Sequence, residues 1–188
     1  MLLTLAAPTR LDAQAPGDAA RLKRLAAGEV LVSVEPIAGS TAGKAHAAIE
    51  IALPPTALWA ILLDCNKTLK FVRRLKSCRV TSADPGGRWD VREHVVEWLW
   101  PLPTVRSVFR SDYIPFERIQ FSRIEGDLKE LTGDWRLMPI RNGRATLLSY
   151  EARVDPGVAL PGVLIRGAIE SELRETLTSL RREATGGG

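Results

Sequence analysis

The side chains able to take part in acid–base chemistry are few and widely spaced in this chain of 188 residues. Its 2 histidines are His46 and His94, and His94 could act as a general base if an acidic group converged on it. Asp90 and Arg92 alternate with His94 in a stretch predicted to be a strand, so the three side chains share one face. A face this polar is typical of a solvated sheet surface.

Two tyrosines offer a different kind of chemistry, because each carries one hydroxyl on an apolar ring. Tyr113 and Tyr150 would either orient the carbonyl group of a ligand or donate to the backbone of a packed core. No nucleophile elbow, HExxH pattern or Cys/His set occurs in the chain. The GSTAGK stretch at 39–44 has its glycines too close together for a phosphate loop, which favours a hairpin turn. We predict no catalytic residue, no metal site and no cofactor from these patterns.

The two cysteines, Cys65 and Cys78, have 12 residues between them, which fits neither a CxxC redox motif nor a zinc site. In an oxidising compartment a disulfide between them would close a loop of about 14 residues and stabilise the fold by roughly 3 kcal/mol in the chain-entropy model. In a reducing compartment they would be two buried thiols. The sequence leaves both states open.

The N-terminal residues bear on the compartment. Residues 2–7 form a short apolar run and the Ala-Gln-Ala at 13–15 matches a signal cleavage pattern, although no basic region precedes the run. We expect residues 1–27 to be a tail, and a signal-peptide remnant if the true start lies upstream. In that case we expect a periplasmic or exported protein, and otherwise a cytoplasmic one.

Composition excludes several classes of protein. Apolar residues make up 45% and charged residues 26% of the chain, enough for the full core of one domain. The net charge of +4 comes from scattered basic residues, whereas nucleic-acid binders concentrate them on one face, so we expect no nucleic-acid partner. No apolar run is long enough to cross a membrane.

Alternating apolar residues predict strands through most of the chain. The predicted strands span residues 30–34, 45–53, 79–83, 89–100, 105–113, 118–124, 128–137 and 145–154. Two short helices are predicted after the first two strands, one with an apolar stripe ending at Cys65 and one carrying Leu69, Val72 and Leu75. A long amphipathic helix is predicted from about Pro161 to about Arg182, and residues 183–188 are a second tail. This order predicts an α+β domain over residues 28–182, in which a curved antiparallel sheet wraps around the C-terminal helix.

Three segments resemble a known superfamily: HAAIEIALPPTALWAILLDCNKTLKFVRRLKSCRV at 46–80, SVFRSDYIPFERIQFSRIEGDLKELTGDWRL at 107–137 and TLLSYEARVDPG at 146–157. They are similar to the START-like polyketide cyclase/dehydrase and lipid-transport superfamily (SRPBCC), and within it to the coenzyme Q-binding branch. The matching features include Trp59 in a Pro-flanked helix, Asp64 at its end, FVxxLKS at 71–77 and GxWxL at 133–137. The resemblance implies a helix-grip fold around a hydrophobic cavity. This sequence differs from the catalytic branches of the superfamily, because no polar cluster is expected on the strands that face this cavity.

Alternation along the later strands and the last helix indicates which residues would line that cavity. Small residues such as Gly133 and Ala152 would leave room among the larger ones. We predict ligand contacts from Phe109, Tyr113, Phe121, Leu131, Trp135, Leu148, Tyr150, Ile165, Ile169 and Leu173.

Three functions are compatible with these patterns. The first is binding or transport of a hydrophobic small molecule such as a lipid, an isoprenoid quinone or an aromatic polyketide. The second is a cyclase or dehydratase that uses Tyr113, Tyr150 or His94 as acid or base. The third is transient contact with a membrane surface through Trp98, Trp100 and the prolines at 101–103. The oligomeric state is not defined by the sequence.

Overall fold

The computed structural model describes residues 16–97, 104–157 and 161–186. Four helices and eight strands follow one another within these residues. They are α1 (Pro16–Ala26), β1 (Leu31–Pro36), β2 (Gly43–Ile51), α2 (Pro55–Leu63), α3 (Cys65–Phe71), β3 (Leu75–Ala83), β4 (Trp89–Glu97), β5 (Thr104–Ile114), β6 (Arg118–Gly126), β7 (Glu130–Ile140), β8 (Ala145–Asp155) and α4 (Gly162–Thr185).

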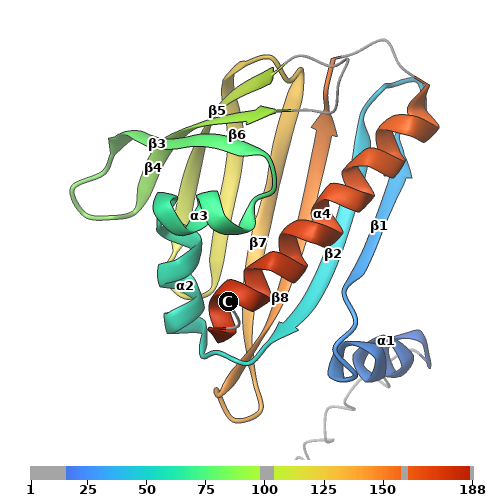
Figure 1. The fold of residues 1–188 in the computed structure, drawn as a ribbon, viewed down its shortest axis with the longest axis vertical. Coiled ribbons are helices and arrows are strands. Elements are labelled where there is room, and N and C mark those ends of the chain that lie inside the picture. The colour runs from blue at the N-terminus through green and yellow to red at the C-terminus, as the bar shows by residue number, and fades with distance from the viewer. Residues whose placement is uncertain (1–15, 98–103, 158–160, 187–188) are drawn as a thin grey trace, which may run out of the picture.

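All eight strands form one antiparallel sheet in the order β1-β2-β8-β7-β6-β5-β4-β3. The sheet is curved, and α2, α3 and α4 lie on its concave side, with α4 running obliquely across it (Figure 1). This is the α+β helix-grip architecture, so the predicted fold class is confirmed. The stretch 39–44 lies at the turn that joins the paired strands β1 and β2, as predicted.

The position of α4 follows from its apolar stripe. Ile165, Leu177 and Leu180 are buried to 3% exposure or less. The helix packs against β1, β2 and α3. It ends where Gly186 adopts a left-handed φ of 70°, a conformation that glycine adopts without steric cost. Because α4 packs on β1 and β2 at one edge of the sheet, other parts of the molecule have to cover the middle strands.

The hydrophobic core brings together residues of α2, the C-terminal half of α4 and the strands beside them. Ile51, Leu58, Leu148, Leu177 and Leu180 are all buried to 1% exposure or less in one cluster. Burying side chains of this kind stabilises the fold by about 1.5–3 kcal/mol each relative to leaving them exposed. This cluster closes one end of the sheet.

Several element ends differ from the prediction. The residues predicted as an N-terminal tail include α1, whose Leu25 is only 3% exposed. The second short helix ends at Phe71, because the backbone is already extended at Val72 (φ −81°, ψ 108°). Arg74 then takes a positive φ of 62°, and Leu75 begins β3 instead. At the other end, α4 continues to Thr185.

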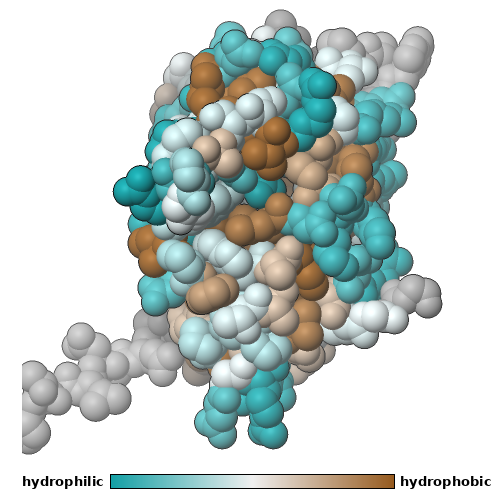
Figure 2. All heavy atoms as spheres, turned by 90° about the vertical axis from the view of Figure 1, so that its left-hand side faces the viewer, coloured by the Kyte–Doolittle hydropathy of each residue, from teal (hydrophilic) through white to brown (hydrophobic). Residues whose placement is uncertain are grey.

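The described helices are all too short or too polar to span a membrane. On the side of the molecule that carries α2 and α3, hydrophobic side chains reach the surface in small groups between hydrophilic ones (Figure 2). Leu69 of α3 and Val80 of β3 are among the exposed apolar residues, at 39% and 48%.

Candidate functional site

A cavity of ≈ 390 Å³ lies between α4, the loop after α3 and the concave face of the sheet. Its volume falls in the range of small-molecule sites. A smaller space of ≈ 100 Å³ adjoins it beneath α2 and α3. The two spaces share five lining residues: Val72, His94, Phe109, Phe121 and Trp135. α4 therefore does not lie flat on the sheet, and room remains beneath it.

Eight of the ten predicted ligand-contact residues lie against these two spaces. Phe109, Phe121 and Trp135 line both, Tyr113 lines the smaller one, and Leu131, Tyr150, Ile169 and Leu173 line the larger one. The other two, Leu148 and Ile165, are buried to 0% and 3% exposure and are not part of either lining. Contact between any of the ten and a ligand stays a prediction.

Aromatic rings make up much of the sheet side of the cavity, beside Val96 and Leu131. Tyr150 stacks on Phe121 with ring centroids 5.8 Å apart, and Trp135 lies 4.5 Å from Tyr150. Phe121 is opposite Gly133 in the pairing of β6 with β7. A Cβ atom at Gly133 would be too close to the Phe121 ring and to the Glu151 carbonyl oxygen. The space at Gly133 is thus occupied by the Phe121 ring, and the glycine allows this aromatic wall to form.

The polar face of β4 points inward, and our interpretation of it as a solvated surface is wrong. Asp90 and Arg92 are 7% and 6% exposed, and His94 lines both spaces. The alternation correctly placed the three on one face, but it does not say which face is the concave one. The expectation that no polar cluster faces the cavity fails with it. Val91 and Val95, at the opposite positions, point the same wrong way, because valines on one face of a strand favour burial of that face.

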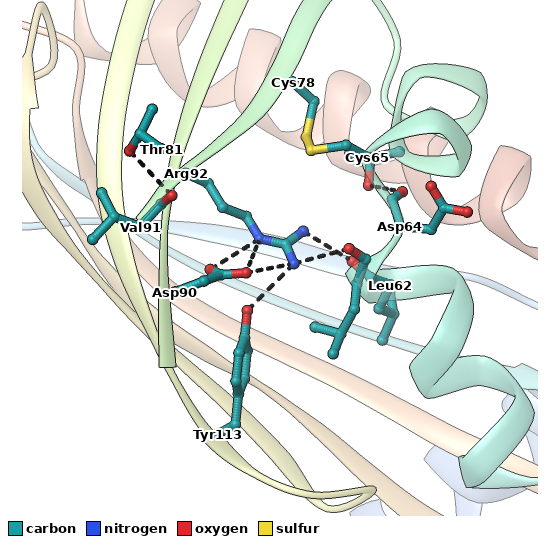
Figure 3. Close-up of polar contacts among 11 residues, drawn as sticks. Leu62, Asp64, Cys65, Cys78, Thr81, Asp90, Val91, Arg92 and Tyr113 are labelled. Atoms are coloured by element: carbon teal, nitrogen blue, oxygen red, sulfur yellow. Dashed lines mark hydrogen bonds and ion pairs between the residues drawn. A yellow bond between two sulfur atoms is a disulfide. The ribbon is translucent and has the colours of Figure 1, made fainter. Parts of the chain in front are cut away.

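Arg92 uses its guanidinium to join β4 to the end of α2 (Figure 3). Its Nε donates to Asp90 over 2.9 Å, and its Nη2 donates to the Leu63 carbonyl over 2.9 Å and to the Tyr113 hydroxyl over 3.3 Å. A longer hydrogen bond of 3.5 Å reaches the carbonyl of Leu62. The last carbonyls of a helix have no partner within it, so this arginine satisfies them. Its role in the described structure is to hold the wall in place.

A disulfide joins Cys65, the first residue of α3, to Cys78 in β3, with their Cα atoms 5.3 Å apart (Figure 3). Beside it, the Asp64 carboxylate accepts from the backbone N–H of Asn66 over 2.8 Å and caps α3. Of the two states that the sequence left open, the structure has the disulfide. The bond holds α3 against the sheet, where Phe71 lines the smaller space.

Burial sets the protonation of the polar groups around the cavity. Desolvation, with a smaller contribution from Arg92, lowers the pKa of His94 to about 4, so the imidazole is neutral at pH 7. Burial raises the pKa of the Tyr113 and Tyr150 phenols above the ordinary value, which keeps both hydroxyls protonated. Burial also raises the pKa of the Glu172 carboxyl on α4. His94, Tyr113 and Tyr150 are therefore all neutral at pH 7.

Sequence reasoning missed Asp90, Arg92 and Glu172 as residues near the cavity. Glu172 lies between apolar stripe residues of α4, but a glutamate at this spacing is also common on the outer face of a helix. The sequence therefore carries no signal that it faces the cavity. As for metal ions, no three His, Cys, Asp or Glu side chains come together within residues 16–97, 104–157 and 161–186.

A family model described as "Polyketide cyclase / dehydrase and lipid transport" matches residues 51–181. The match runs from the end of β2 through most of α4, and so includes the cavity. A comparison with curated protein sequences found no match.

Several solved structures share this fold. The STAR-related lipid transfer protein of Xanthomonas axonopodis has a TM-score of 0.71 at 15% identity, over 83% of this chain and 93% of its own. Human STARD10 has a TM-score of 0.70 at 12% identity, over 95% of this chain and 83% of its own. The Zhui aromatase/cyclase of Streptomyces sp. R1128 has a TM-score of 0.61 at 14% identity, over 77% of this chain and 92% of its own. Identities this low show the fold alone, and none of these matches singles out the coenzyme Q-binding branch.

Proposed function

Because the chain belongs to the polyketide cyclase/dehydrase and lipid transport family, we propose that it binds or carries an apolar small molecule in the cavity beneath α4. The observation that carries this proposal is the ≈ 390 Å³ space between α4 and an aromatic wall. Burial of apolar ligand surface would contribute about 25 cal/mol per Å². A lipid, an isoprenoid quinone and an aromatic polyketide are the ligand classes that we consider.

The aromatic wall favours ligands with flat rings among these classes. Phe121, Trp135 and Tyr150 offer faces and edges within 6 Å of one another. Aromatic groups in such offset arrangements contribute about 0.5–1.5 kcal/mol beyond the area that they bury. We therefore rank quinones and aromatic polyketides above saturated lipids as ligands.

A cyclase or dehydratase is the second candidate function, because His94 and Tyr113 line the same small space. The protonation of these groups argues against it. A general base works best when its pKa is near the operating pH, whereas the pKa of His94 is lowered to about 4. The Tyr113 hydroxyl is engaged with Arg92, and burial raises its pKa. Binding without chemistry is the simpler function for this site.

Localisation and membrane contact are further proposals. The disulfide between Cys65 and Cys78 supports a periplasmic or exported protein, since cytosolic thiols are usually kept reduced. Transient contact with a membrane surface would suit a carrier of apolar molecules. The residues that we assigned to that contact, Trp98, Trp100 and the prolines at 101–103, lie outside the described residues.

The binding proposal is tested by titrating the protein with a naphthoquinone and following tryptophan fluorescence. We expect saturable quenching in the wild type and a large loss of affinity in Trp135→Ala, because this ring lines both spaces. Trp89→Ala is the matched control: Trp89 packs on Arg110, 4.3 Å from the ring centroid, and lines neither space. Mass spectrometry of an organic extract of the purified protein identifies any ligand that co-purifies. Equal quenching in both variants, with no extracted species, would refute the proposal.

A further inference from the structure

Two buried polar atoms near the cavity have no hydrogen-bond partner among the described residues. One is Nε2 of His94 on β4, and the other is Oε1 of Glu172 on α4. Both residues line the larger space, one from the sheet and one from the helix that lies across it (Figure 1). Leaving a buried polar group unpaired costs about 1–3 kcal/mol, so natural structures rarely do so without a reason.

The surroundings of His94 leave the ligand space as the place where its partner would lie. The ring meets Phe109 edge to face at 4.9 Å, and Arg92 two residues away is already bonded to Asp90 and to the end of α2. His94 lines both spaces, so its ring lies where they adjoin. A ligand that fills the larger space would therefore contact the His94 ring.

A hydroxyl group is the ligand group that suits both unpaired atoms. A neutral imidazole accepts at one nitrogen and donates at the other, and a hydroxyl is able to pair with either. The same hydroxyl group is able to donate to a carboxylate or accept from a carboxylic acid. A hydrocarbon would leave both atoms unpaired. A carboxylate would meet a second carboxyl at Glu172.

We propose that the cavity selects an apolar alcohol or phenol, whose hydroxyl pairs with His94, over the corresponding hydrocarbon, and that Glu172 disfavours the corresponding carboxylic acid. The inference rests on the proposed function and narrows the class of ligand. The lowered pKa of His94 supports it, because a neutral ring is an acceptor or donor for neutral groups.

Cationic side chains at the cavity favour a different ligand, one with an acidic group. The test therefore has to distinguish an acidic ligand from a hydroxyl compound. Arg73 and Arg74 line the larger space near Glu172. Arg73 is paired with Glu175 on α4. Arg74 is therefore the group that would receive an acidic ligand.

The test compares 2-naphthol, 2-methylnaphthalene and 2-naphthoic acid, which share one ring system and differ in a single substituent. Dissociation constants are measured by fluorescence titration for the wild type, His94→Phe and Glu172→Gln. His46→Phe is the matched control, because His46 lies on β2 beside Glu151 and lines neither space. Circular dichroism checks that each variant is folded.

We expect His94→Phe to weaken 2-naphthol about tenfold, which corresponds to about 1.4 kcal/mol, and to leave 2-methylnaphthalene within about twofold. Glu172→Gln should strengthen 2-naphthoic acid several-fold, and His46→Phe should change none of the three. If His94→Phe does not fold, the wild type still decides, because 2-naphthol has to bind more tightly than the more apolar methyl compound.

Three results would overturn the inference. Equal effects of His94→Phe on the naphthol and the methyl compound would reduce His94 to a structural role, and leave the binding proposal intact. Tightest binding of 2-naphthoic acid, lost in Arg74→Gln, would mean that an anionic group is recognised. Failure of all three probes to bind would remove this inference, and the naphthoquinone titration and the extract would then decide on the proposed function separately.

Discussion

Arg92 of β4 donates a hydrogen bond of 2.9 Å to the carbonyl oxygen of Leu63, the last residue of α2. The same guanidinium pairs with Asp90 on its own strand. One side chain thus connects the outer part of the sheet to the helices that cover the smaller space. The disulfide between Cys65 and Cys78 makes a second connection a few residues further along. Together they hold the wall that α3 contributes to the site.

Arg92→Met should lower the free energy of unfolding by about 3–5 kcal/mol, because it leaves the buried Asp90 carboxylate without its partner. Arg153→Met is the control, since its pair with Glu130 is about half exposed and should contribute less than about 1 kcal/mol. Urea denaturation followed by circular dichroism measures both. Similar losses in the two variants would contradict the structural role of Arg92.

Stability should fall as the pH drops from 6.5 towards 4, because of His94. Its pKa is about 4 in the folded protein and 6.5 in the unfolded chain, so the unfolded chain takes up the proton first. Within this window the free energy of unfolding falls by at most about 1.4 kcal/mol per pH unit. Above it, His94 does not make stability depend on pH. Denaturation at pH 7.5 and pH 5 should show a smaller decline for His94→Phe than for the wild type. Equal declines in the two proteins would contradict the lowered pKa of His94.

Gly133→Ala should destabilise the protein by about 1–3 kcal/mol, because the new methyl group has no space beside the Phe121 ring and the Glu151 carbonyl. Gly167→Ala on α4 is the opposite case. Nothing lies within 4 Å of a Cβ there, and alanine is favoured in a helix by about 1 kcal/mol. Thermal unfolding should therefore shift down for the first variant and up for the second. An unchanged unfolding midpoint for Gly133→Ala would contradict the close packing of the Phe121 ring and the Glu151 carbonyl at this position.

Cys65→Ser combined with Cys78→Ser should cost roughly 3 kcal/mol, the value expected for a loop of this length. Because α3 lines the smaller space, ligand affinity should fall as well. Denaturation with and without a reductant checks the first effect, and a quinone titration of the double variant checks the second. A wild type that unfolds at the same urea concentration with and without reductant would show that the bond does not form in solution.

Most elements of the fold could be predicted from local patterns. Alternating valines and isoleucines predict strands, the stripe from Ile165 to Leu180 predicts the long helix, and Asn142 and Gly143 predict the last hairpin turn, where both adopt a positive φ. These properties depend on residues a few positions apart. Element ends were less certain, since the backbone at Arg74 and the packing of Leu25 depend on neighbours distant in the sequence.

The sequence by itself determined the order of the elements and the residues that share each face. Only the tertiary structure decided that Asp90, Arg92 and His94 face inward, that Phe121 fills the space at Gly133, and that Glu172 meets the cavity. The physical reason is that alternation and helical period define faces relative to their own element. Which face is enclosed depends on the curvature of the whole sheet and on where α4 lies across it.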